Sequence, residues 1–114
     1  MAGIGIDQRG DFQPEGSEQQ GVRPVVVVSR QAINGSSQVV IVVPCTTYRP
    51  QRRVYPSQVV VRAPEGGLTV DSVALCEQVR ALSIDRIIAR RGQLRVATMH
   101  EVDDALRNAL ELDA

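Results

Sequence analysis

The chain has 114 residues, 43% of them hydrophobic, which is enough for one folded domain with a modest core. Thirteen basic residues, all arginine, balance thirteen acidic ones. This neutrality excludes the global positive field typical of duplex-DNA-binding proteins, although a local arginine cluster can still bind nucleic acid.

The two cysteines, Cys45 and Cys76, lie in apolar, strand-like surroundings, and we expect both to be buried, reduced thiols. One histidine and no Cys-x-x-Cys motif argue against a zinc site, so no metal is expected. The N-terminus lacks a signal-peptide pattern, and the longest apolar run is too short to cross a bilayer. The sequence therefore predicts a cytoplasmic protein without a membrane partner.

The N-terminal segment holds a short candidate strand at Gly3–Asp7, which could be an edge strand. A polar, glycine-punctuated loop follows at Phe12–Val22 and carries Ser17, Glu18 and Gln19. From spacing alone, an ordinary connection is favoured over an active-site loop, because no phosphate-cradling pattern is present.

Two valine-rich runs, Val25–Val28 and Val39–Val43, predict neighbouring strands buried in a sheet. Arg23 precedes the first run, and Thr46 and Thr47 follow the second. In antiparallel neighbours the start of one strand and the end of the next share an edge, so we expect Arg23 and Thr46 to meet. Taken alone, each also fits a structural role, as a surface charge or a turn residue.

A basic loop follows, in which Arg49, Arg52 and Arg53 lie between Tyr48 and Tyr55. Arginines beside aromatic residues suit single-stranded RNA, because guanidinium groups contact phosphates and rings stack on bases. A solvated, purely connecting loop explains the pattern equally well.

The next segments predict further β-structure. Gln58–Arg62 and Ser72–Arg80 are interpreted as strands, and Ser83–Arg91 as a short helical turn with Ser83 as N-cap. Glu77 and Gln78 then fall on a strand, either facing an RNA groove or a dimer contact, or forming an outward polar edge.

Near the C-terminus the apolar period changes to that of a helix, from about Val96 to Leu112. This helix should cover one open side of the sheet, and the same face suits dimerisation. His100 lies on its polar side beside Glu101, so we interpret it as a surface residue rather than a general base.

Several of these motifs together resemble the MazF/PemK family of toxin endoribonucleases. They are the segment GSEQ-x-G-x-RP-V-V-V-x-S, the later VVPCTT, and the stretches Glu65–Leu68 and Asp71–Arg80. The resemblance runs from about Asp11 to the C-terminus. It implies a mainly β fold, an SH3-like small barrel of the CcdB/PemK type with a C-terminal α-helix, in a single domain whose residues 1–10 are atypical.

The resemblance also implies the activity and its residues. Members of the family cleave single-stranded RNA without a metal or cofactor and leave a 2′,3′-cyclic phosphate and a 5′-hydroxyl. Arg23 matches the family's catalytic arginine, Thr46 its catalytic threonine and Glu18 its loop carboxylate. The implied partners are a MazE-like antitoxin, whose acidic tail occupies the RNA groove, and a second copy in a homodimer. The implied RNA-binding residues are Ser17, Gln19, Thr47, Tyr48, Arg49, Arg52, Arg53, Glu77 and Gln78.

Two other classes remain open. The related CcdB-type toxins share the fold but poison DNA gyrase through protein contacts, and they lack the Arg/Thr phosphate site that this chain keeps. An inactive relative that only binds RNA or antitoxin is the other alternative, because Gln8–Gly10 stand where the family has an apolar strand.

Overall fold

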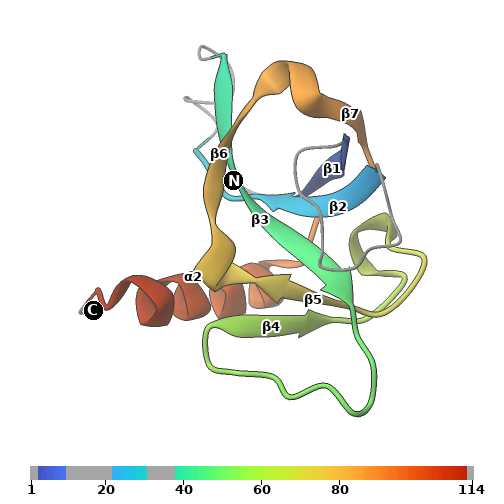
Figure 1. The fold of residues 1–114 in the computed structure, drawn as a ribbon. Helices are drawn as coiled ribbons and strands as arrows, with labels where there is room; N and C mark the ends of the chain where they lie inside the picture. The colour runs from blue at the N-terminus through green and yellow to red at the C-terminus, as the bar shows by residue number, and fades with distance from the viewer. Residues whose placement is uncertain (1–2, 10–21, 31–37, 113–114) are drawn as a thin grey trace.

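The computed structural model describes residues 3–9, 22–30 and 38–112 (Figure 1). Within them lie seven strands, one α-helix and three short 3-10 helices. The strands are β1 (Gly3–Arg9), β2 (Val22–Val27), β3 (Val39–Thr47), β4 (Gln58–Val61), β5 (Ser72–Leu75), β6 (Arg80–Ser83) and β7 (Ile87–Arg90). The helices are η1 (Glu65–Gly67), η2 (Cys76–Gln78), η3 (Ile84–Arg86) and α2 (Val96–Leu110).

The strands form one antiparallel sheet in the order β4-β5-β3-β2-β1-β7, with β6 paired to β3. The first strand is longer than Gly3–Asp7 and is not at an edge, because β2 and β7 pair with its two sides. The N-terminal strand is therefore present, and its Gln8 lies opposite Arg23.

The long strand β3 changes partners along its length. Its first half, Val39–Val42, pairs with β6, and its last three residues, Cys45–Thr47, pair with β5. The change falls at Pro44, which is fully buried and has no N–H to donate to a ladder. Thr46 and Thr47 thus lie at the C-terminal end of β3, where their backbones pair with β5.

Two predicted segments prove different. Ser72–Arg80 is not one strand but β5 and β6 separated by η2, because the chain must pass Pro44 to pair with both halves of β3. Ser83–Arg91 is helical only over η3, where the Ser83 hydroxyl does accept the Asp85 N–H at 3.4 Å. Its second half is β7, because pairing with β1 satisfies that backbone better than a single helical turn.

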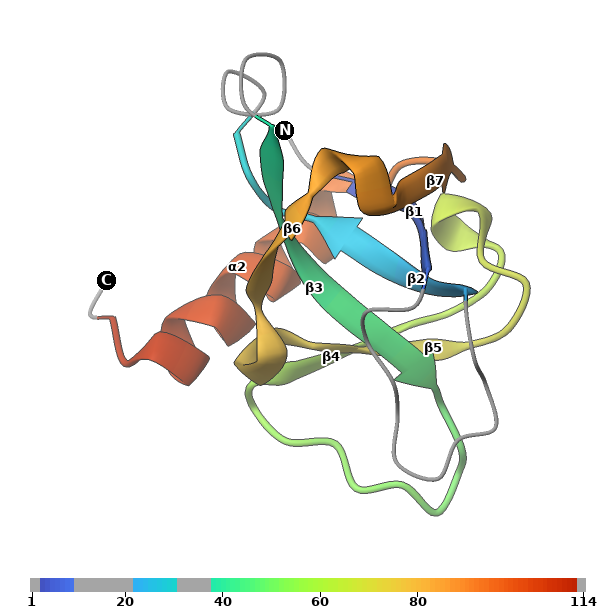
Figure 2. The same ribbon diagram turned by 45° about the horizontal axis from the view of Figure 1, so that its top comes forward.

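The helix α2 was predicted from its apolar period, and it covers one side of the sheet near β4 and η2 (Figures 1 and 2). Val102 and Ala105 are buried in the main core, and Met99 and Leu106 pack against it. The strands contribute about half of this core, chiefly through the buried Val43 and Cys45 of β3 and Val59 and Val61 of β4. Burial of β3 and β4 fits their richness in valine.

Glu65 of η1 joins the start of this helix. Its carboxylate accepts the Arg95 N–H at 2.9 Å and the Arg95 guanidinium at 3.3 Å. Burial opposes ionisation of Glu65, but these bonds and one from Thr98 outweigh burial and lower its pKa. A carboxylate at a helix N-terminus is favourable, so this contact ties α2 to the turn before β5.

The expected fold class, mainly β with one C-terminal helix, is confirmed. Strand pairing in residues 3–9, 22–30 and 38–112 follows a path from β4 to β7, and the SH3-like barrel stays a prediction. No helix in this part of the chain has the length and apolar character needed to span a membrane.

Candidate functional site

A cavity of about 90 Å³ lies at the edge of the sheet where β2 begins and β3 ends. Arg23 and Thr46, the two residues expected to meet there, both line it. The remaining lining residues come from these two strands, from the segment before β5, from the start of β5 and from the residue after β7. They are Pro24, Cys45, Thr47, Leu68, Thr69, Val70, Ser72 and Arg91.

Strand register explains how Arg23 and Thr46 come together. In the ladder between β2 and β3, Val25 lies opposite Pro44. Continuing the same antiparallel register by two residues sets Arg23 against Thr46. On the other side, Thr46 is paired with Val73 of β5, so its backbone belongs to a rigid element rather than to a loop.

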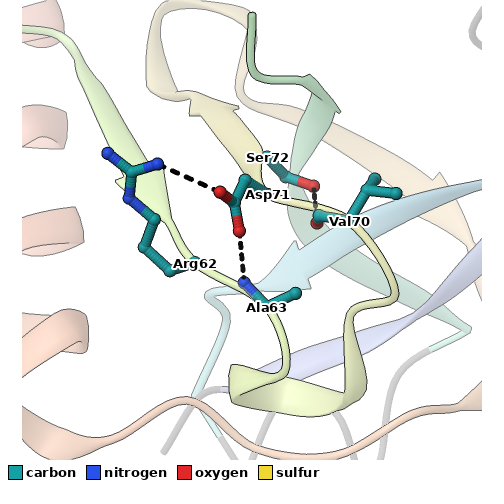
Figure 3. Close-up of polar contacts among 5 residues, drawn as sticks. All are labelled: Arg62, Ala63, Val70, Asp71 and Ser72. Carbon is teal, nitrogen blue, oxygen red and sulfur yellow. Dashed lines mark hydrogen bonds and ion pairs between the residues drawn. The ribbon is translucent and has the colours of Figure 1, made fainter.

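The cavity has a positive lining. Arg23 and Arg91 are its charged residues, and no carboxylate of the described residues lines it. Three threonines, Thr46, Thr47 and Thr69, add residues with hydroxyl groups, whereas the hydroxyl of the lining residue Ser72 donates to the Val70 carbonyl at 3.0 Å (Figure 3). Guanidinium groups and hydroxyls in a small recess are suited to an anion such as a phosphate group.

Asp71 is adjacent in sequence to two cavity-lining residues, but its carboxylate is bound elsewhere. It stands between two lining residues, Val70 and Ser72, but its carboxylate accepts the Ala63 N–H at 2.9 Å and the Arg62 guanidinium at 3.0 Å (Figure 3). The Ala63 bond first, and then the Arg62 bond, lower the pKa of Asp71. Its negative charge is therefore committed to the β4–β5 connection.

Cys45 also lines the cavity, but its thiol is protonated and therefore unreactive at neutral pH. Burial raises its pKa to about 12, and nearby Cys76 adds to the rise. At neutral pH roughly one thiol in 10⁵ would then be ionised, and the thiolate is the reactive form. A cysteine nucleophile at this site is not supported.

The basic loop between β3 and β4 begins beside the cavity and swings away from the sheet (Figure 1). The Tyr48 N–H donates to the Asp71 carbonyl at 2.9 Å, and the Arg62 guanidinium covers the Tyr48 ring at 4.8 Å. Further along, Arg53 lies 5.3 Å from the centre of the Tyr55 ring.

The three loop arginines differ in exposure. Arg49 and Arg53 are exposed, whereas Arg52 is half-buried. The Arg52 N–H donates to the Arg49 carbonyl at 2.8 Å, which closes a turn. The loop therefore contains a turn closed by Arg49 and Arg52, and the side chains of Arg49 and Arg53 are exposed to solvent.

Glu77 and Gln78 lie on η2 rather than on a strand, and both are exposed. The Glu77 carboxylate accepts the Gln58 amide at 2.9 Å and the Ser57 hydroxyl at 3.3 Å. It thereby holds the far end of the basic loop, and neither residue lines the cavity.

The candidate loop residues Ser17, Glu18 and Gln19 lie outside the described residues, so their relation to the cavity stays a prediction. His100 is exposed on α2, as expected, and lines a different groove of about 340 Å³ with Arg30, Met99 and Asp103. In the described part of the chain, no group of three His, Cys, Asp or Glu side chains is arranged to hold a metal ion.

The sequence interpretation gave no role to Arg91, Thr69 or Ser72. Arg91 was assigned to the end of a helical turn, and the signal that places it at the cavity is a contact with the Gly66–Gly67 turn. That contact joins segments far apart in the chain, and sequence periodicity does not report it.

Comparison with known proteins gives consistent matches. The profile of the family described as PemK-like, MazF-like toxin of type II toxin–antitoxin system matches residues 10–110. Endoribonuclease MazF9 of Mycobacterium tuberculosis is 36% identical over 108 residues, covering 90% of each chain. The structure of Mycobacterium tuberculosis toxin MazF-mt6 has a TM-score of 0.78 at 25% identity, over 98% of this chain and 99% of that one. A mycobacterial endoribonuclease in complex with its cognate antitoxin has a TM-score of 0.73 at 27% identity, over 96% and 95%.

Proposed function

Because the chain belongs to the PemK-like, MazF-like toxin family of type II toxin–antitoxin systems, we propose that it is an endoribonuclease acting on single-stranded RNA. The observation that carries the proposal is the shared cavity of Arg23 and Thr46, which has a positive lining and several hydroxyls. Such a recess fits the phosphate of an RNA backbone.

The proposed reaction uses the nucleophile that RNA itself provides. The 2′-oxygen attacks the adjacent phosphorus and loses its proton, while the bond from phosphorus to the 5′-oxygen breaks and that oxygen gains a proton. The products are a 2′,3′-cyclic phosphate and a 5′-hydroxyl. The protein needs to align the attack in line and to stabilise the added charge, and these two effects can supply most of the acceleration without a metal.

Each of three residues has a proposed part. Arg23 binds the non-bridging oxygens through its fork of donors and assists the departing 5′-oxygen, because a guanidinium stays protonated and is a poor base. Thr46 donates its hydroxyl to the same phosphate. Glu18 accepts a proton or orients Arg23. The position of Thr46 in a strand supports this assignment, since its direction is set by the ladder with β5.

RNA on either side of the reacting phosphate is proposed to follow the basic loop. Thr47 and Tyr48 lead away from the cavity, and the exposed Arg49 and Arg53 offer phosphate contacts. The remaining members of this proposed surface are Arg52, Ser17, Gln19, Glu77 and Gln78. The sequence selectivity of cleavage would arise from contacts of this surface with bases.

We further propose that a MazE-like antitoxin inhibits the protein by laying an acidic segment over the same arginines. A family relative has been solved as an endoribonuclease with its cognate antitoxin, which supports a partner of this kind. A homodimer is proposed as the active form, with the second copy extending the RNA groove.

One assay tests the central proposal. The purified protein is incubated with mixed-sequence RNA in the presence of EDTA, and the new ends are mapped. We expect cleavage that persists with the chelator and leaves cyclic phosphate ends, and we expect an all-deoxy substrate to stay intact. Loss of activity in EDTA, or cleavage of the all-deoxy strand, would contradict the proposed metal-independent attack by the 2′-hydroxyl. Antitoxin binding without cleavage would instead identify an inactive relative.

The residue assignments have a sharper test in Arg23→Lys and Thr46→Val. Lysine keeps the charge but loses the planar fork, and valine removes the hydroxyl at nearly constant volume. Each should lower kcat by on the order of 100-fold while RNA affinity changes little. Arg107→Lys, on the exposed side of α2, is the matched control and should cleave at the parental rate. A folded Arg23 or Thr46 variant with parental turnover would remove that residue from the site.

A further inference from the structure

We propose that Arg91 is a second phosphate-binding residue of the cavity, contacting the scissile phosphate of RNA together with Arg23. The inference rests on the proposed ribonuclease function and assigns an additional residue to it. Arg91 follows β7, far along the chain from β2 and β3, and is half-buried at the cavity that Arg23 and Thr46 also line.

The Arg91 side chain is held in place at the cavity. Its Nη1 atom donates to the Gly67 carbonyl at 3.4 Å, and Gly67 belongs to the turn that leads into the lining residues Leu68 and Thr69. The guanidinium is therefore bound to the residue that directly precedes this part of the cavity lining. A charge fixed before the substrate arrives costs less to orient when the transition state forms.

The backbone beneath Arg91 is equally constrained. Gly67 has φ +82°, and a Cβ there would lie 2.6 Å from the Arg91 carbonyl oxygen. A Cβ on Gly92 would lie 2.9 Å from the carbonyl group of Gly66. Each segment thus has a glycine where the other approaches, and this close packing brings Arg91 to the cavity.

The charge of Arg91 suits it to bind a phosphate group. Arg23 and Arg91 both line a cavity of about 90 Å³ to which no described residue contributes a carboxylate. The phosphate gains negative charge as the 2′-oxygen attacks, so two guanidinium groups stabilise that state more than the starting one.

The test compares Arg91→Gln with Arg91→Lys. Glutamine keeps a donor for the Gly67 carbonyl but has no charge, whereas lysine keeps the charge. Arg107→Gln on α2 is the matched control. Binding is measured on a parental cleavage-site RNA made non-cleavable by a 2′-deoxy sugar, across a series of salt concentrations. Turnover is measured on the all-ribose strand, and thermal unfolding reports folding.

Arg91→Gln should lower the slope of log affinity against log salt by about 0.7, the value for one lost phosphate contact on a single strand. It should also lower kcat by on the order of 100-fold. Arg91→Lys should keep the salt slope and lose less turnover, and Arg107→Gln should match the parent. A folded Arg91→Gln protein with parental slope and turnover would overturn the inference.

The two proposals can fail separately. If the parent cleaves RNA and Arg23→Lys is impaired while Arg91→Gln is unchanged, only the role of Arg91 is wrong. If the parent cleaves no RNA, the ribonuclease proposal fails, and the salt slope on mixed-sequence single-stranded RNA still decides whether Arg91 contacts phosphate. An equal loss in the Gln and Lys variants would assign Arg91 a purely structural role and would also overturn the inference.

Discussion

At the scale of single residues, chemistry at the cavity depends on which side chains are able to react. Cys45 lines the cavity but is fully buried, and Cys76 is fully buried as well. Burial raises the pKa of each thiol to about 12, and the charges of Glu77 and Asp103 add to the rise at Cys76. Because neither thiol is a suitable nucleophile, the residues that line the cavity fit charge stabilisation by arginine instead.

This chemistry predicts slow alkylation. In the folded protein at neutral pH, iodoacetamide should leave both Cys45 and Cys76 unmodified, because few thiolates form and the sulfurs are covered. In denaturant both should react, which mass spectrometry of the intact chain would show as two added groups. Native alkylation at the rate of an exposed thiol would contradict the buried, protonated state.

At the scale of elements, the contact between Glu65 and α2 is a joint between the η1 turn and the helix. Glu65 is mostly covered, with 13% of its side chain exposed, while Arg95 is 75% exposed. The backbone bond from Arg95, which occupies the N-cap position of α2, is the shorter of the two contacts, at 2.9 Å against 3.3 Å. Helix position and the turn beside Arg91 are therefore coupled through Glu65.

Glu65→Gln should destabilise the fold by about 1 kcal/mol at neutral pH, the usual cost of weakening a helix cap. Because the folded-state pKa of Glu65 is lowered, its contribution is present above the ordinary value of 4.5 and is lost as the pH falls through the lowered pKa. Urea denaturation at pH 7 and near pH 3 should show the parent and the variant converging in acid. If the difference in unfolding free energy between parent and variant is the same at both pH values, the proposed link between stability and the ionisation of Glu65 is contradicted.

Asp104→Asn is the control for that experiment. Asp104 pairs with Arg107 at 2.8 Å on the surface of α2, where both side chains are largely exposed. Exposed pairs of this kind contribute about 0 to 1 kcal/mol, so this variant should unfold close to the parent at both pH values.

The loop between β3 and β4 is the other element with a testable role. Arg53→Ala should weaken binding to single-stranded RNA and lower the salt slope by about 0.7, because one exposed phosphate contact is lost. Arg107→Ala removes an arginine of α2 that is also exposed, and it should leave the slope unchanged. Titrations of the non-cleavable RNA at several salt concentrations would measure both. Equal slopes in all three proteins would make the loop a simple connection.

At the scale of the whole molecule, charge is local rather than global. Thirteen arginines and thirteen acidic residues cancel, yet the cavity and the basic loop gather arginines at one edge of the sheet. A neutral protein with one positive region should favour a ligand that fits that region over any polyanion.

Long duplex DNA should therefore compete poorly with single-stranded RNA at physiological salt, because a rigid helix cannot bring a phosphate into a recess of about 90 Å³. A competition titration with labelled non-cleavable RNA measures this directly. Displacement by duplex DNA at an equal concentration of phosphate would show that binding is only non-specific and electrostatic.

The sequence by itself determined the elements whose signal is local. The valine runs predicted β2, β3 and β4, and the apolar period predicted α2 to within two residues of its end. The meeting of Arg23 and Thr46 followed from the geometry of neighbouring antiparallel strands. Each of these features depends on residues close together in the chain or on one pairing rule.

Tertiary structure alone decided the rest. Ser72–Arg80 became two strands because β3 has two partners on one side, with Pro44 at the change, and β7 formed because β1 offered its backbone a ladder. Arg91 reached the cavity because glycines let two distant turns touch. In each case a backbone group or side chain is satisfied by a segment remote in sequence, and local periodicity carries no record of that partner.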